Sequence, residues 1–257
     1  MLNFFIFSSN DIINISFKYK YCRFSKFLKS QYTRFKFLLL IENGADVNKE
    51  DKDGNTPLIY VCRRGNENIV RLLIENGADF NKENKYGDTP LFEACGNVNE
   101  NIVRLLIEKG SDINKKNKYG DTPLIGACNY SNENIVRLLI ENGADVNKED
   151  KDGNTPLIEA VMGNNESIIR FLIENGADVN KENRKGNTPL IETCDNYKDN
   201  ENIIRLLIEN GADVNKEGKN GDTPLIVTHR KGNENIKRLL IENGALSIDK
   251  KKLNCDI

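Results

Sequence analysis

The 257-residue sequence lacks tryptophan and has two methionines and one histidine, His229. It also lacks a long apolar run: the longest near the start is Phe4–Phe7, far short of the roughly 18 residues that a membrane-spanning helix needs. No secretory leader is expected, because the first ten residues contain no Lys or Arg and Asn10 and Asp11 interrupt the apolar stretch. We therefore expect a cytoplasmic protein that is not secreted, with the nucleus as an alternative.

The motifs that carry catalysis or cofactor binding are also missing. There is no C-x-x-C pair, and Cys62, Cys95, Cys128 and Cys194 are 33, 33 and 66 residues apart, which predicts buried, reduced thiols. No glycine-rich phosphate loop occurs, and the sequence that starts at Asp51 has no Glu to close a calcium loop. One histidine leaves no paired-histidine site. We expect no metal, no cofactor, no small-molecule substrate and no enzyme activity.

What the sequence does contain is one phrase repeated along its length. Thr-Pro-Leu recurs every 33 residues and once after 35, starting at Thr56, Thr89, Thr122, Thr155, Thr188 and Thr223. A glycine ends each unit, at Gly44, Gly77, Gly110, Gly143, Gly176, Gly211 and Gly244. The two extra residues fall within 195–199, where the other units have a short turn. An insertion in a turn that keeps the phase on either side is typical of a repeat array.

Each unit reads as two short helices followed by an extended turn. In the unit that starts at residue 150, Thr155 is predicted to cap a helix with proline at its first position, ending near Met162. A second helix is predicted from Glu166 to Asn175, with apolar residues spaced three and four apart. Neither helix can bury its apolar face alone, so neighbouring units must stack.

These phrases resemble the ankyrin repeat, in the 33-residue period, the T-P-L start and the L-L-x-x-G-A-D-V-N ending. The resemblance implies an all-α repeat solenoid of ankyrin helix–turn–helix units joined by extended, β-hairpin-like turns. One departure is that the family usually has histidine after T-P-L, where this chain has Ile59, Phe92, Ile125, Ile158, Ile191 and Ile226. That change leaves the hydrogen bonding of the turns to be explained.

The repeat phase also predicts how the chain divides. Residues 1–17 are unassigned, 18–249 form the array and 250–257 form a polar tail. The units are 18–50, which is degenerate, then 51–83, 84–116, 117–149, 150–182, 183–217 and 218–249. The last unit has Lys237 where the others have Val or Ile, as expected of a unit that no further repeat covers.

Candidate binding residues lie where the repeats differ from one another. In the ankyrin family the turn tips and one face of the first helix line the concave groove that holds protein partners, so the resemblance implies a non-catalytic, monomeric module that binds another protein there. The variable tip residues are Asp53, Tyr86, Tyr119, Asp152 and Lys185, with Asn220 in the last unit. The variable first-helix residues are Tyr60, Arg63, Arg64, Glu93, Tyr130, Glu159, Met162, Glu192, Asp195, Arg230 and Lys231. This set predicts a face with basic ends and an acidic centre.

A second hypothesis comes from charge segregation. Residues 1–36 carry a net charge of +6 and the remainder −8. The basic residues are interspersed with Phe and Tyr: Lys18, Lys20, Arg23, Lys26, Lys29, Arg34 and Lys36. Such a segment is suited to contact an anionic membrane surface or nucleic acid, and it is equally suited to form an imperfect N-terminal cap on the array. Binding assays with and without residues 1–36 would separate these alternatives.

Overall fold

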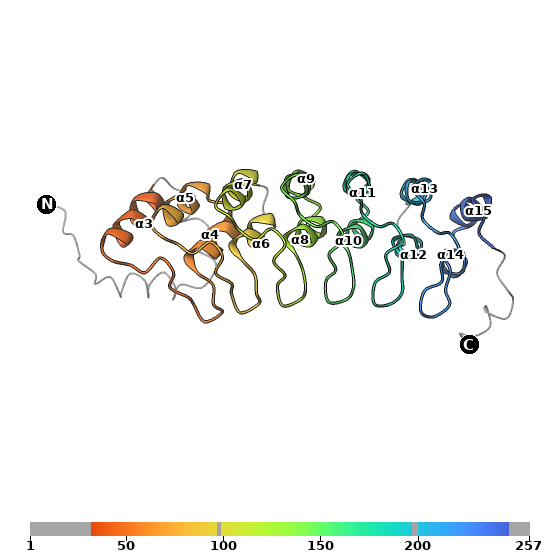
Figure 1. Cartoon of the computed structure of the whole chain (residues 1–257), viewed down its shortest axis with the longest axis horizontal. Coiled ribbons are helices and arrows are strands. Elements are labelled where there is room, and N and C mark those ends of the chain that lie inside the picture. The colour runs from red at the N-terminus through yellow and green to blue at the C-terminus, as the bar shows by residue number, and fades with distance from the viewer. Residues whose placement is uncertain (1–31, 97–98, 197–199, 247–257) are drawn as a thin grey trace. The chain divides into compact units, whose positions relative to one another are not determined.

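The computed structural model describes residues 32–96, 99–196 and 200–246, and this part of the chain consists of short α-helices and turns. The helices alternate between first and second members of each repeat (Figure 1). Their bounds are α3 (Tyr32–Glu42), α4 (Pro57–Arg64), α5 (Glu67–Glu75), α6 (Pro90–Cys95), α7 (Glu100–Glu108), α8 (Pro123–Asn129), α9 (Glu133–Glu141), α10 (Pro156–Gly163), α11 (Glu166–Glu174), α12 (Pro189–Asp195), α13 (Glu201–Glu209), α14 (Pro224–Lys231) and α15 (Glu234–Glu242).

The Thr-Pro pair starts every first helix from α4 to α14, as the sequence predicts. In α10 the Thr155 backbone is extended and its hydroxyl accepts a hydrogen bond from the Ile158 N–H at 3.3 Å. Proline follows at the first helical position, where the missing N–H needs no partner. The other five first helices repeat this cap. The position after Thr-Pro-Leu is therefore held by its backbone amide, while its side chain is free to pack in the core.

The second helices carry the amphipathic pattern that the sequence predicts. In α5, Ile69, Val70, Leu72 and Leu73 are buried, while the opposite face carries charged side chains. Glu and Arg one turn apart pair on that face, at 2.9 Å for Glu67–Arg71, and the pairing recurs in α9, α11 and α13. Each exposed pair contributes only a few tenths of a kcal/mol. The ladder keeps this face solvated and contributes little to stability.

The chain divides into two compact units that each contain several repeats. From here on, the first unit is residues 1–112 and the second unit, which is the larger, is residues 113–257. In the first, α4 packs against α6 and α5 against α7. In the second, α8, α10, α12 and α14 pack in succession, and Figure 1 shows the second helices of this unit in a separate tier, with the extended turns on the other side of the first helices. The helix pairs therefore bury their apolar faces against neighbours, as expected of stacked repeats.

Asparagine side chains at the ends of several repeats, at Asn48, Asn114, Asn147, Asn180 and Asn215, link each of these repeats to the next one. In the second unit, Asn147 donates from its amide to the Gly176 carbonyl at 3.0 Å and accepts from the Asp178 N–H at 2.9 Å. Asn180 makes the equivalent pair of bonds to Gly211 and Asp213. The asparagine of the G-A-D-V-N phrase thus satisfies backbone groups of the following repeat, which explains why it recurs.

The ends of the array are described only in part. Lys237 is partly exposed and reaches Glu234 at 3.2 Å, whereas the equivalent residues of the internal repeats, such as Val136 and Ile204, are fully buried. Two extra residues lie between the end of α12 and the start of α13, as the repeat phase predicts. The N-terminal segment 1–17, residues 18–31 of the degenerate first repeat and the tail 250–257 lie outside the described residues.

Candidate binding surface

The six extended turns, at 51–55, 84–88, 117–121, 150–154, 183–187 and 218–222, place one variable residue each at the tip. An Asp or Asn at the first position of a turn fixes that placement. The Asn117 side-chain oxygen accepts from the N–H groups of Tyr119 and Asp121, both at 2.9 Å. The first five turns share the bond to the tip N–H. In the sixth turn the first position is Gly218, which has no side chain to hold Asn220. Five of the six predicted tip residues are therefore held by the same local bonds.

Neighbouring turns within a unit are joined by backbone bonds. In the second unit the Lys151 N–H donates to the Tyr119 carbonyl at 2.9 Å and the Arg184 N–H to the Asp152 carbonyl at 2.7 Å. Side-chain amides add further bonds: Asn183 donates to Asn154 at 3.1 Å. The sequence left open how the turns are tied together when isoleucine replaces histidine after Thr-Pro-Leu. Backbone and asparagine groups supply these bonds.

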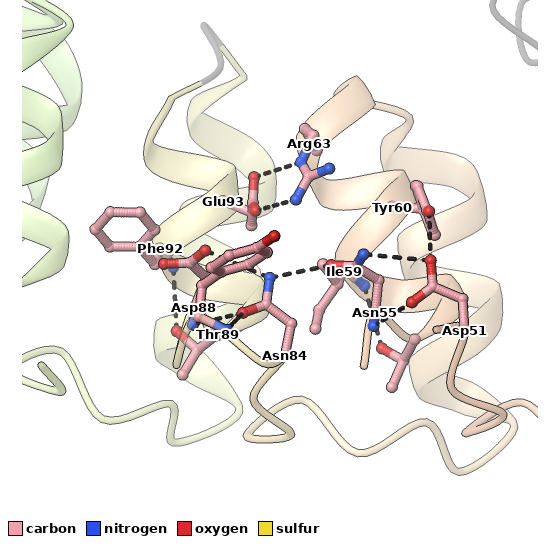
Figure 2. A network of polar contacts seen from close by, with 12 residues as sticks. Asp51, Asn55, Ile59, Tyr60, Arg63, Asn84, Asp88, Thr89, Phe92 and Glu93 are labelled. Carbon is pink, nitrogen blue, oxygen red and sulfur yellow. Dashed lines mark hydrogen bonds and ion pairs between the residues drawn. The ribbon is translucent and has the colours of Figure 1, made fainter. Parts of the chain in front are cut away.

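In the first unit, the residues predicted for the first-helix face form one polar network (Figure 2). Arg63 donates through Nε to Glu93 at 2.7 Å and makes a second, shorter contact to the same carboxylate. The Arg63 guanidinium also lies 5.8 Å from the centre of the Tyr60 ring. The hydrogen bond to Glu93, opposed by partial burial, raises the pKa of Arg63. The predicted basic end of this unit is therefore largely neutralised at Arg63, while Arg64 is exposed.

The Tyr60 hydroxyl continues that network into the turn. It donates to the Asp51 carboxylate at 2.6 Å, and Asp51 also accepts from the N–H groups of Asp53 and Asn55. Burial acts to raise the pKa of Asp51, but the bonds from Tyr60 and Asn55 outweigh it, and the pKa of this carboxyl is lowered. Tyr60 is thus half-buried and fixes the turn in addition to presenting its ring.

In the second unit, Glu159 was predicted to be an exposed residue of the acidic centre, and this exposure is wrong. The sequence places Glu159 on the exposed face, but its side chain is 7% exposed. Its carboxylate accepts from the Asn154 amide at 2.9 Å, and α10 is packed between α8 and α12. Burial, together with the nearby carboxylates of Asp150, Asp121 and Glu192, raises the pKa of Glu159, although the bond from Asn154 opposes this. A partner cannot reach this side chain without displacing its neighbours.

Glu192, the equivalent residue in the next repeat, is half-buried. One of its carboxylate oxygens accepts from Asn183 at 2.9 Å and from Asn187 at 3.0 Å. At the far end of the unit, Asp195 pairs with Lys231 at 2.9 Å and Arg230 pairs with Asp222. The predicted alternation of basic ends and an acidic centre is therefore reduced, because acids and bases of this face pair with each other.

The exposed apolar side chains, in contrast, gather on the predicted residues. Between α3 and α15, the large apolar side chains that are exposed among the described residues are Tyr86, Tyr119, Tyr130 and Met162, at 47%, 58%, 65% and 47%. All four lie on turn tips or at the ends of first helices. Outside this stretch, Phe35 and Leu39 on α3, Ile241 on α15 and Leu246 are also exposed.

One position of the turns hardly varies between repeats, so variation does not mark it as a candidate. The second residue of every turn is basic and exposed: Lys52, Lys85, Lys118, Lys151, Arg184 and Lys219. The sequence signal for this position is its regular recurrence, one basic residue in each turn. Each of these residues directly precedes the tip residue of its own turn.

The cysteines and the histidine of the described residues do not form a reactive or metal-binding site. Cys62, Cys95, Cys128 and Cys194 are free and buried, and burial raises the pKa of Cys194 to about 12. His229, which takes the place of these cysteines in the last repeat, is exposed near the end of α14. The described residues contain no cluster of three His, Cys, Asp or Glu suited to a metal ion. Among the described helices, none has the length and hydropathy that spanning a bilayer requires.

Comparison with known proteins agrees with the architecture. The family model for ankyrin repeats, described as three copies, matches residues 28–117, 109–183 and 176–252. No curated protein matches the chain. The matched ranges together cover most of the sequence, and the paired helices, the Thr-Pro caps and the turns all fall within them. The chain belongs to the ankyrin repeat family.

Proposed function

We propose that this chain is a non-catalytic module that binds another protein across the face formed by the turn tips and first helices. Ankyrin repeats are typically protein–protein interaction modules, and the family match is to these repeats. The observation that carries the proposal is the position of exposed Tyr119, Tyr130 and Met162 on this face. The opposite helices expose a repeated Glu–Arg ladder instead, which offers a partner little apolar area.

Aromatic residues and methionine are enriched where protein partners meet, because they bury large areas at a low cost in side-chain entropy. Tyr119 and Tyr130 flank α8, and Met162 lies near the end of α10, which packs on α8. We therefore expect these three residues to form the centre of the contact in the second unit. The exposed charges around them, including Asp152 and Lys185, would form its rim.

The other predicted contact residues keep their place in this proposal, with the exception of buried Glu159. In the first unit they are Asp53, Tyr60, Arg63, Arg64, Tyr86 and Glu93. Residues already paired with each other, such as Arg63 and Glu93, would contribute shape more than free charge. We expect the apolar residues to dominate the affinity and the charges to affect mainly the association rate.

We also propose that the chain acts as a monomer inside the cell, without a cofactor. The four described cysteines are free thiols buried in first helices. A reducing compartment would keep such thiols reduced. Sedimentation at increasing concentration would test the monomer, and mass growing with concentration would contradict it.

Affinity capture with matched surface variants tests the function. The face variant carries Tyr119→Ser, Tyr130→Ser and Met162→Ser, and the control carries Ile241→Ser and Leu246→Ser, which remove exposed apolar side chains elsewhere. All five side chains are at least 47% exposed, so both variants should fold like wild type. Proteins that bind specifically should be lost from the face variant and kept by the control. Equal recovery with both variants would contradict the proposal.

A further inference from the structure

One basic side chain per repeat projects from the turns of the second unit. Lys118, Lys151, Arg184 and Lys219, called here the turn row, are all exposed. None of the four is paired with a carboxylate in the described part of the chain. Other lysines of this unit are paired: Lys181 with Glu149 at 2.8 Å and Lys216 with Glu182 at 2.9 Å. Lys181 and Lys216 thus have carboxylate partners, whereas the positive charges of the turn row are not matched by a carboxylate among the described residues.

The spacing of the turn row is fixed by the backbone. The N–H of Lys151 bonds to the Tyr119 carbonyl, that of Arg184 to Asp152 and that of Lys219 to Lys185, the last at 3.4 Å. Since neighbouring helices pack roughly 8–10 Å apart, successive turns should repeat at about that distance. A peptide in the polyproline II conformation advances about 3.1 Å per residue with three residues per turn, so every third side chain lies on the same face, about 9 Å from the previous one. Carboxylates at every third residue of an extended segment would therefore match the cations one for one.

A surface hollow of about 330 Å³ lies at the end of this row, between the last two turns. Lys185 and Lys219 line it together with Asn187, Asn220, Asp222 and Arg230. Arg230 is already paired with Asp222, but Lys185 and Lys219 have no carboxylate partner among the described residues. Asp195 also lines the hollow, and it is paired with Lys231 as Asp222 is with Arg230, so a carboxylate side chain that entered would meet Lys185 and Lys219 as donors beside two acids whose charge is already matched.

We propose that the turn row and this hollow dock an extended acidic segment of the partner protein, with Asp or Glu at about every third residue. The proposal rests on the proposed protein-binding function and names the chemistry of one part of that partner. The charges favour a peptide over nucleic acid. Asp152 stands next to Lys151 at a tip, and Asp150 begins the same turn. A nucleic-acid strand has a phosphate at every nucleotide and would set some of them against these carboxylates, whereas an acidic peptide can leave neutral residues there.

Fluorescence anisotropy with the full chain tests the proposal. The probe is a labelled peptide of four Glu-Gly-Ser repeats, compared with the same peptide carrying Gln in place of Glu. The turn variant carries Lys151→Gln, Arg184→Gln and Lys219→Gln. The control carries Arg170→Gln, Arg205→Gln and Arg238→Gln, which removes the same charge from second helices. Wild type should bind the Glu peptide at least about tenfold more tightly than the Gln peptide. The turn variant should lose most of that preference, and the control should change it less than about twofold.

A third peptide separates spacing from net charge, because it has the same composition with its four Glu residues adjacent. Weaker binding of this peptide than of the spaced one supports the docking geometry, and equal binding overturns it. Equal losses in the turn variant and the control would also overturn it, as would tighter, turn-dependent binding of twelve-nucleotide oligothymidylate. If the acidic peptide fails while the face variant still loses its captured protein, the protein-binding function stands and the acidic partner does not.

Discussion

Two glycines with the same backbone conformation separate the cost of a left-handed residue from the cost of crowding between turns. Gly143, which follows α9, has φ of 92°, and Gly120, in the turn before α8, has φ of 89°. Replacing either with alanine forces an L-residue into the left-handed region, which costs about 1 kcal/mol. A Cβ on Gly143 would meet nothing within 4 Å. At this position the conformational term should be the whole effect.

At Gly120 the same Cβ would lie 2.6 Å from the Lys151 nitrogen and 2.8 Å from the Asp150 carbonyl carbon, both backbone atoms of the next turn. The turns would have to separate, which costs about 1–3 kcal/mol for a crowded site. Separation would also weaken the bond from the Lys151 N–H to the Tyr119 carbonyl, by about 0.5–1.5 kcal/mol. Since these two terms overlap, we expect Gly120→Ala to cost about 2–4 kcal/mol in total.

Urea unfolding at 25 °C, followed by circular dichroism at 222 nm, measures both variants against wild type. Gly143→Ala should lower the free energy of unfolding by about 1 kcal/mol and Gly120→Ala by at least about 1 kcal/mol more. Hydrogen exchange should then show faster exchange at the Lys151 amide in Gly120→Ala only. Equal costs for the two variants, or an unchanged Lys151 amide, would refute the close stacking of the turns.

Three further predictions concern buried Glu159, the bond from Tyr60 to Asp51 and the N-terminal segment. The raised pKa of Glu159 means that the folded state binds its proton more tightly than the unfolded state, so stability falls as pH rises through the folded pKa. Glu159→Gln should therefore raise the urea midpoint at pH 7 and lose that gain below pH about 4.5, and a lowered midpoint at pH 7 would contradict it. Tyr60→Phe removes the bond to Asp51 and should lower the free energy of unfolding by about 1 kcal/mol at pH 7. The loss should become smaller in acid, once the pH falls below the lowered pKa of Asp51 and the carboxylate is protonated. A loss that does not change with pH would contradict this prediction. Replacing the basic residues of 18–36 with Gln should abolish binding to phosphatidylserine vesicles or oligonucleotide if that segment contacts them, and should only lower stability if it forms a cap.

The helices could be predicted from the sequence because their signals are local. Thr155 caps α10 and proline follows it, and both act within one turn of the chain. The repeat phase also located the insertion after Asp195, since an extra turn residue leaves the flanking helices unchanged.

The binding face was predicted less completely because exposure depends on neighbouring repeats. Glu159 has the same place in its repeat as Glu93 and Glu192, but those two are half-buried and Glu159 is buried. Spacing on one helix gives the direction of a side chain and not what covers it. The pairing of Arg63 with Glu93 is likewise a contact between repeats that no single repeat reveals.

The asparagine bonds between turns were missed for a different reason. The first position of the turns is Asp, Asn or Gly, and only where it is Asn, as at Asn84 and Asn183, does its side chain have an amide that can donate to the preceding turn. Their amides carry the bonds that link one turn to the next, to Asn55 and Asn154 respectively. A residue that recurs along the chain can therefore hold neighbouring turns together, as these asparagines do, or present a repeated surface charge, as the turn row does.

Hydroxyl-radical footprinting of the complex with a captured partner tests the central claim most directly. Tyr and Met side chains oxidise readily, so Tyr119, Tyr130 and Met162 report on the proposed face, and exposed Ile241 with half-buried Phe171 reports on second helices. A partner bound to the proposed face should protect the first three residues severalfold and leave the other two unchanged. Protection of Ile241 and Phe171, with Tyr119, Tyr130 and Met162 still oxidised at the free rate, would contradict it.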